Sequence, residues 1–294
     1  MHKFLRAIGF SSVKKSAIQK LVDHMPGEHY RYANAISSEN EEIVEYTAIY
    51  GERFGISVCG EYNAEGSFVR EYYYPFFVGE GVTTVQYIEV EKRADRESYS
   101  VICDEPNIGV PLIFYLQNMT EYLNAKFIGV QHDIKENVTL SGLSDEGKIL
   151  LPIFKSEEEK RRNDNVFRKR SRLVEAARNG DDEAIETLTL EDMDIYADIS
   201  NRIATEDILS IVETTFMPYG IESDEYTIIG EIVQFKEEEN YLTEETVVIL
   251  KLVCNKLTFD ICINKEDLLG EPAVGRRFKG NVWIQGRINY SYDE

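Results

Sequence analysis

The sequence predicts an α+β protein with an N-terminal helix and antiparallel sheet, a helical middle segment and a small C-terminal β-barrel resembling an oligonucleotide-binding (OB) barrel. The hydrophobic period changes from that of strands to that of helices near residue 156, and returns to that of strands near 226. Apolar residues make up 43% of the 294 positions, and Tyr (18) and Phe (14) are plentiful. These observations divide the chain into residues 1–154, 155–222 and 223–294.

The chain begins with an amphipathic helical segment over residues 3–24. Its apolar side chains recur at roughly helical spacing. Ser11 or Ser12 would serve as a cap, so one helix or two short helices separated by a break both fit the pattern. The sequence Met25-Pro26-Gly27 ends the segment.

Strands follow from residue 42 to residue 154. Runs such as "FGISVCGEY" and "VQYIEVEKR" are separated by turn signals at 63–66, 79–81 and 93–96, which predict an antiparallel meander. The stretch 109–127 fits either a strand running into a helix or a helix alone. The stretch 138–154 predicts a hairpin that turns between Ser144 and Gly147.

Helices dominate from 156 to 217. Ser156 and Glu159 form a capping box, and Gly180 stands where a helix C-cap belongs. Two or three more helices follow, as far as Pro218 and Gly220. Five short strands with glycines at their ends then fill residues 226–290, which favours a small closed barrel.

The net charge of −21 makes bare duplex nucleic acid and anionic membranes poor partners. The charge is uneven: residues 155–178 hold nine Lys/Arg and five Asp/Glu, whereas residues 180–245 hold two and twenty. The basic stretch includes Arg161, Arg162, Arg168, Lys169, Arg170 and Arg172. Pairing within the fold is favoured over nucleic-acid binding, because the acidic region follows at once.

The cysteines and the hydropathy indicate a cytoplasmic protein. The four cysteines are widely spaced, with no pair two residues apart, which is typical of reduced thiols. The N-terminus lacks the apolar run of a signal peptide, and no stretch approaches the ~18 apolar residues of a membrane span.

Motifs for catalysis, metals and cofactors are missing from the sequence. His24 and His29 are five residues apart and separated by a Pro-Gly turn, and neither HExxH nor a Ca²⁺ loop occurs. Phosphate-binding loops and GxSxG are also lacking. Cys103 is followed by two acids, which raise a thiol pKa. We therefore expect no metal, no cofactor and no assignable catalytic residue.

Six residues are candidates for an interaction: Tyr72, Tyr74, Arg276, Arg277, Trp283 and Arg287. In "EYYYPFFVG", Tyr72 and Tyr74 share one strand face, while Pro75 indicates an edge strand or a bulge. These rings are either interface anchors or, as we favour, core. In "GRRFKGNVWIQGRINY", Trp283 either packs in or against the barrel, which we favour, or forms a ligand face with the three arginines.

The segments "MHKFLRAIGF", "LVEAARNGDDEAIETLTLEDMDIY", "FMPYGIESDEYTIIGEI" and "VGRRFKGNVWIQGRI" span nearly the whole chain. Together they resemble an uncharacterised protein family of clostridial bacteria (Firmicutes) that is classed only as a domain of unknown function. The resemblance implies a bacterial cytoplasmic protein without an established activity, so no functional residues carry over.

The leading hypothesis is a non-catalytic cytoplasmic binding or scaffolding protein with an unknown protein partner. One alternative is a hydrolase-type enzyme that uses carboxylates, although whether the protein is an enzyme stays open, leaning towards no. A second alternative is a nucleic-acid-associated protein acting through the basic helix and the barrel. The oligomeric state is left open.

Overall fold

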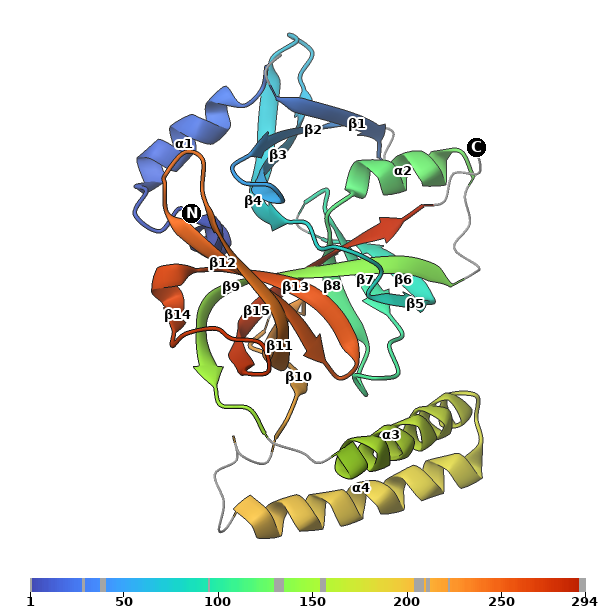
Figure 1. Ribbon diagram of the computed structural model, residues 1–294. Coiled ribbons are helices and arrows are strands. Elements are labelled where there is room, and N and C mark those ends of the chain that lie inside the picture. Colours follow the sequence, from blue (N-terminus) through green and yellow to red (C-terminus); the bar gives the residue numbers. More distant parts are fainter. Residues whose placement is uncertain are drawn as a thin grey trace.

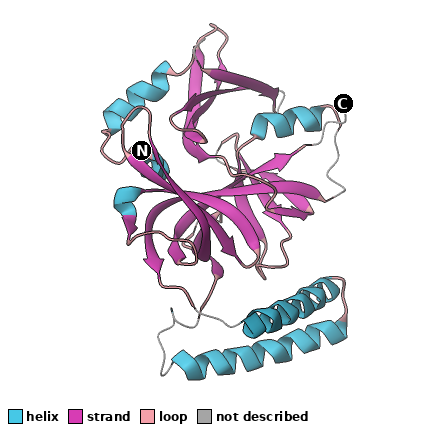
Figure 2. Cartoon of the chain, viewed as in Figure 1, coloured by secondary structure: helices cyan, strands magenta, loops and turns pink. Residues whose placement is uncertain are grey.

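A computed structural model describes residues 2–27, 30–37, 41–94, 96–129, 135–153, 157–203, 209, 212–221 and 223–290. A four-stranded sheet lies above a larger barrel, and two long helices lie below it (Figure 1, Figure 2). The predicted α+β class is confirmed in outline, with an N-terminal antiparallel sheet, helices in the middle of the chain and a β-barrel.

The first helical segment is broken, in agreement with one of the two predicted forms. A 3₁₀ helix, η1, spans Lys3–Ile8, and α1 spans Lys15–His24. Gly9 ends η1 with a φ of 83°, a left-handed conformation that glycine adopts without strain. The predicted serine cap is wrong, because no side chain caps α1. Ser12 instead donates its hydroxyl to Glu245 of the barrel region at 2.5 Å.

The N-terminal sheet, here called sheet A, is an antiparallel meander in sequence order. Its strands are β1 (Arg31–Ile36), β2 (Glu42–Ile49), β3 (Phe54–Tyr62) and β4 (Phe68–Phe77). The predicted turn at 63–66 joins β3 to β4. Strand β4 pairs within sheet A with β3 alone, so the edge position predicted from Pro75 is confirmed.

The next part of the chain adds strands to the barrel sheet. It comprises β5 (Thr84–Gln86), β6 (Ile88–Lys92), β7 (Tyr99–Cys103), β8 (Leu112–Leu116) and α2 (Met119–Phe127). The stretch 109–127 is therefore a strand followed by a helix, the first of the two forms left open. Strands β6, β7 and β8 pair in antiparallel order, and β8 continues onto the barrel.

Five strands close the barrel. They are β9 (Glu136–Leu150), β11 (Glu225–Glu239), β12 (Thr246–Cys254), β13 (Leu257–Asn264) and β15 (Arg277–Asn289). The order β11-β12-β13-β9-β15 returns to β11, and only the β13–β9 pair is parallel. The C-terminal segment supplies four of these strands, and β9 comes from before the helices. The division of the chain at 154 and 222 stays a prediction.

Strand β9 overturns the predicted hairpin. The chain stays extended from Ser144 to Gly147. Asp145, between the paired residues Ser144 and Glu146, has no partner on β15 and forms a bulge. Gly147 is needed for packing rather than for a turn. A Cβ built there would lie 2.3 Å from the Phe278 ring. Glycine is common in turns, but at this position it leaves room for the Phe278 ring to pack over the strand.

The helices of the middle segment form an antiparallel hairpin below the barrel (Figure 1). Helix α3 spans Glu157–Arg178 and α4 spans Asp182–Ile203. Gly180 lies between them with a φ of 85°, as its predicted C-cap role requires. Ser156 of the predicted capping box lies outside the described residues.

Short elements complete the fold. They are β10 (Thr215–Pro218), η2 (Lys265–Asp267) and β14 (Leu268–Leu269). Strand β10 pairs with β11, so the prediction of helix over 215–217 is wrong. One hydrophobic core runs from η1 and sheet A into the barrel.

Candidate functional site

The structure brings three of the six candidate residues together. Tyr72 and Tyr74 of β4 meet Trp283 of β15 around a hollow of about 210 Å³. We call this hollow the aromatic pocket and define it by His2, Tyr72, Tyr74, Arg93, Arg96, Tyr115 and Trp283. The candidates Arg276, Arg277 and Arg287 do not line it.

Trp283 forms one wall of the aromatic pocket. Its ring centroid lies 4.8 Å from that of His2, 5.5 Å from that of Phe4 and 5.2 Å from that of Tyr115. The indole nitrogen donates to Asp224 Oδ2 at 2.9 Å, and the side chain is only 5% exposed. Trp283 is therefore packed between η1 and the barrel, as the favoured interpretation expects.

Three tyrosines form the opposite wall. The ring centroids of Tyr74 and Tyr115 are 4.9 Å apart, and those of Tyr72 and Tyr74 are 6.2 Å apart. Tyr72 donates to the Glu97 carbonyl at 2.7 Å. Tyr72 and Tyr74 are both buried, so within this chain they are core residues, as the favoured interpretation expects. A role in an interface stays a prediction.

Arginines from the β6–β7 turn border the aromatic pocket. The Arg93 guanidinium lies 5.6 Å from the Tyr115 ring centroid, and that of Arg96 lies 5.5 Å from the Tyr72 centroid. These distances are in the range of cation–π contacts. Arg93 also pairs with Asp224, so one carboxylate holds both an arginine and the tryptophan nitrogen.

The N-terminal residues close one side of the pocket. Burial, together with nearby cations, lowers the pKa of His2 to about 4, so its imidazole is neutral at pH 7. His2 Nδ1 is buried and has no hydrogen-bond partner in the described part of the chain. Lys3 pairs with Glu225 at 2.6 Å. The pocket wall thus contains a neutral ring whose nitrogen is unused.

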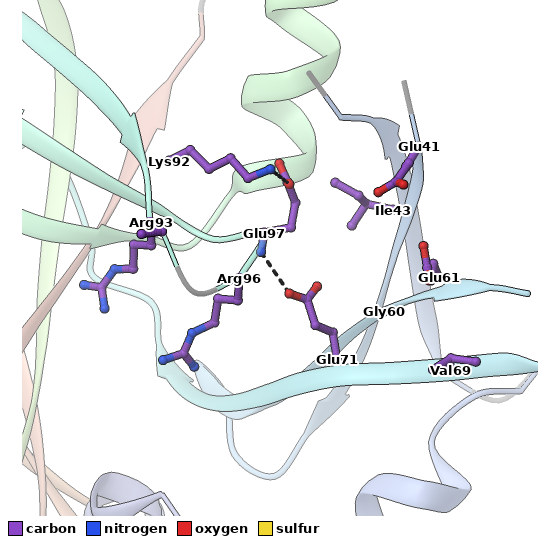
Figure 3. Close-up of a pocket in the computed structure, with 11 residues that line it drawn as sticks. Glu41, Ile43, Gly60, Glu61, Val69, Glu71, Lys92, Arg93, Arg96 and Glu97 are labelled. Atoms are coloured by element: carbon purple, nitrogen blue, oxygen red, sulfur yellow. Dashed lines mark hydrogen bonds and ion pairs between the residues drawn. The ribbon is translucent and has the colours of Figure 1, made fainter. Parts of the chain in front are cut away.

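A larger hollow of about 590 Å³ lies on the other side of the same turn (Figure 3). Four glutamates line it: Glu41, Glu61, Glu71 and Glu97. Figure 3 shows Lys92 directed towards Glu97, with which it forms an ion pair, while Arg93 and Arg96 extend away from Glu41 and Glu61. Lys92, Arg93 and Arg96 line this hollow as well, and the two arginines also line the aromatic pocket, so the turn lies between the two hollows.

The other three candidate arginines have structural partners. Arg277 is buried and donates to the carbonyls of Leu151, Leu209 and Val212, and burial lowers its pKa. These hydrogen bonds connect the segments before and after the helical hairpin to the barrel. Arg276 donates to the Glu271 carbonyl at 2.8 Å, and Arg287 pairs with Glu121 at 2.8 Å.

The basic helix is paired in part with its neighbour. Lys169 of α3 bonds Glu191 of α4 at 2.9 Å, and Arg170 bonds Asp192 at 2.6 Å. Arg161, Arg162, Arg168 and Arg172 are exposed or nearly so on the same helix. These two ion pairs agree with the pairing within the fold that the charge pattern favours.

Within the described residues, no three His, Cys, Asp or Glu side chains are grouped to hold a metal, and His29 and His132 lie outside those residues. All four cysteines are buried thiols. Burial raises the pKa of Cys103 to about 12, with Glu105 and Asp104 adding to the shift. No helix among the described residues is long and apolar enough to span a membrane.

Sequence reasoning missed four of the seven residues that define the aromatic pocket. His2, Arg93, Arg96 and Tyr115 come from separate segments and carry no motif. The pattern at 93–96 predicts a turn, but nothing in that pattern connects Arg93 and Arg96 to the tyrosines. Only the folding of β4, β8 and β15 around one point brings these side chains together.

Comparisons with known proteins give one match. The family model described as "Domain of unknown function, E. rectale Gene description (DUF3881)" matches residues 5–286. No curated protein and no solved structure shows significant similarity to the chain. The resemblance inferred from the sequence is confirmed by a match over almost the whole length. The chain therefore belongs to the DUF3881 family of domains of unknown function.

Proposed function

We propose that this protein is a non-catalytic binding protein of the cytoplasm and that the aromatic pocket is its ligand site. One observation carries the proposal: rings from the N-terminus, β4, β8 and β15 converge on one hollow that arginines border. Aromatic walls with a few polar groups are typical of small-molecule sites.

The charges around the pocket favour an anionic ligand. Its lining contains three cations (Lys3, Arg93 and Arg96) and two carboxylates (Asp224 and Glu225), while His2 is neutral at pH 7. The charges of the lining therefore sum to +1, in a chain whose net charge is −21. Electrostatic complementarity therefore points to a negatively charged group beside the rings.

The size of the hollow favours a ligand with one ring. Its volume of about 210 Å³ is below the roughly 300–1,000 Å³ of pockets for drug-sized ligands. A flat ring would fill the hollow beside Tyr115 and Trp283, and its anionic group would reach the arginines. Such a ligand is a free aromatic acid or phosphate.

The carboxylates at this site support binding rather than hydrolysis. Asp224 is held by Trp283 and Arg93, and Glu225 is held by Lys3. A general base must be free to take a proton from the reacting group. These acids are committed to ion pairs and hydrogen bonds, which counts against the hydrolase alternative here.

We infer further that the barrel is a variant of the OB type. Five strands with one parallel pair agree with such a barrel, in which β9 would take the place of the fifth strand. OB barrels stack nucleic-acid bases on accessible rings. Burial of Trp283 therefore counts against the nucleic-acid alternative, and fold alone does not assign function.

Fluorescence of Trp283, the only tryptophan, tests the proposal directly. We expect phenyl phosphate and benzoate to change its emission saturably, with Kd values of roughly 0.1–1 mM. Uncharged benzyl alcohol should bind more weakly. Arg96→Ala should weaken the binding of both anions about tenfold. Arg276→Ala removes an arginine outside the pocket and serves as the matched control.

Two outcomes would overturn the proposal. One is the lack of any saturable emission change with each anionic ring compound at concentrations up to about 10 mM. The other is an equal effect of Arg96→Ala and Arg276→Ala on binding. Circular dichroism of both variants establishes that loss of binding is not loss of fold.

A further inference from the structure

A third hollow of about 470 Å³, here called the sheet cleft, lies between sheet A and the junction of β8 with α2. The residues that matter for its chemistry are Tyr32, Glu45, Thr47, Ser57, Tyr74 and Gln117. Tyr74 also lines the aromatic pocket, so its side chain stands between the two hollows. The sheet cleft is nevertheless a separate site with different walls.

The charged groups of the sheet cleft balance one another. Three arginines and three glutamates line it. Arg53 is paired with Asp260 at 2.6 Å, and Arg287 is paired with Glu121 at 2.8 Å. The protein thus already neutralises two of the three arginines, and a strongly charged ligand would find little complementary charge.

Hydrogen-bonding groups from sheet A and from Gln117 also line the cleft. Glu45, 6% exposed, accepts a hydrogen bond from the Tyr74 hydroxyl at 2.8 Å. The hydroxyls of Thr47 and Ser57 lie 3.2 Å apart. Gln117 donates from Nε2 to three acceptors, while its Oε1 is buried without a partner among the described residues. An unmatched buried acceptor is costly and would accept a ligand hydroxyl.

Apolar surface completes the walls. Ile49, Phe76 and Val78 line the sheet cleft beside these polar groups, and Tyr32 presents a half-exposed ring. A site that combines hydroxyl, amide and carboxyl groups with a ring face suits a molecule with both hydroxyls and C–H surfaces. The volume lies within the range of small-molecule pockets.

We propose that the sheet cleft binds a neutral, hydroxyl-rich ligand of the size of a mono- or disaccharide. Its hydroxyls would bond to Thr47, Glu45 and Gln117, each of which accepts hydrogen bonds. Its C–H face would lie against Tyr32. A site built on such bonds discriminates strongly against analogues that lack the hydroxyls.

Saturation-transfer NMR and calorimetry on the full chain test this inference. The probes are glucose, maltose and sorbitol, with gluconate and glucosamine as charged analogues. We expect the neutral compounds to bind with Kd values of roughly 0.1–10 mM and the charged ones to bind more weakly. Thr47→Val and Tyr32→Ala should each weaken binding by about tenfold.

Matched controls exist elsewhere in the chain. Thr189→Val on α4 changes an exposed threonine, and Tyr241→Ala removes an exposed ring between β11 and β12. Both should leave binding unchanged. The inference is overturned by a lack of transfer to every neutral probe at about 50 mM, by tighter binding of a charged analogue, or by equal effects of test and control variants. Failure here leaves the Trp283 response to anionic rings intact, so the two proposals fail separately.

Discussion

Arg53, in the turn between β2 and β3, donates from Nη1 to Oδ2 of Asp260 on β13 at 2.6 Å. The two residues are 207 positions apart, and the Asp260 side chain is almost fully buried. The same carboxylate oxygen accepts from the Glu80 amide at 3.1 Å, and Lys251 lies 3.8 Å from the other oxygen. This ion pair connects sheet A to the barrel.

Removal of Arg53 should destabilise the protein strongly. Arg53→Ala leaves Asp260 as a buried carboxylate without its main cation, and breaking such a pair typically costs about 3–5 kcal/mol in the free energy of unfolding. Urea denaturation followed by circular dichroism measures the loss. Arg70→Ala, which removes the more exposed pair with Asp23, should cost about 0–1 kcal/mol. Equal midpoints for the two variants would contradict the expectation.

Periodicity predicted the elements well where local pattern decides the structure. The meander of sheet A and the turn at Gly180 follow from spacing and turn residues, whereas the break before α1 is one of two forms that the pattern leaves open. It misled at β9, because Ser144 and Gly147 resemble a turn in composition although β15 pairs along them. Sheet pairing with a strand more than a hundred residues away overrides such a local signal.

The candidate site was predictable only in its most unusual residues. Tyr74 and Trp283 stood out by composition, and both line the aromatic pocket. Arg277 stood out for the same reason, yet it holds three backbone carbonyls in place. Arg93 and His2 gave no signal, because their role depends on neighbours that only the fold brings close.

Replacement of Trp283 should lower stability by about 3–5 kcal/mol, because Trp283→Ala removes a large buried ring and leaves a cavity. The wild-type emission should be blue-shifted and should move to the red on denaturation. Thermal melts of wild type and variant measure the loss. A red native spectrum with an unchanged melting temperature would mean that the indole is exposed in solution.

Duplex DNA should not bind at physiological salt. The net charge is −21, and two cations of the basic helix already pair with α4. A gel shift with about 1 µM protein in roughly 150 mM salt should show no complex. A complex that forms at submicromolar protein and weakens as salt rises would contradict this. Its loss in Arg161→Ala/Arg162→Ala would then locate the binding on α3.

Stability at neutral pH should respond to Glu45. Burial raises the pKa of this carboxyl above its ordinary value of 4.5, although hydrogen bonds from Tyr74 and Ser57 oppose the shift. A raised folded pKa means that the folded state holds the proton more tightly than the unfolded state. The contribution of this group is therefore fully present below about pH 4.5 and is lost as pH rises through the folded pKa.

Glu45→Gln keeps the shape of the side chain and removes its ionisation. The variant should gain stability relative to wild type as pH rises from about 5 to 8, because only wild type must bury a carboxylate there. Urea denaturation at several pH values measures the difference in the free energy of unfolding. Glu61→Gln, which changes an exposed acid of β3, should show no such trend. A Glu45→Gln difference that stays constant across this range would mean that the folded and unfolded states titrate alike at this position.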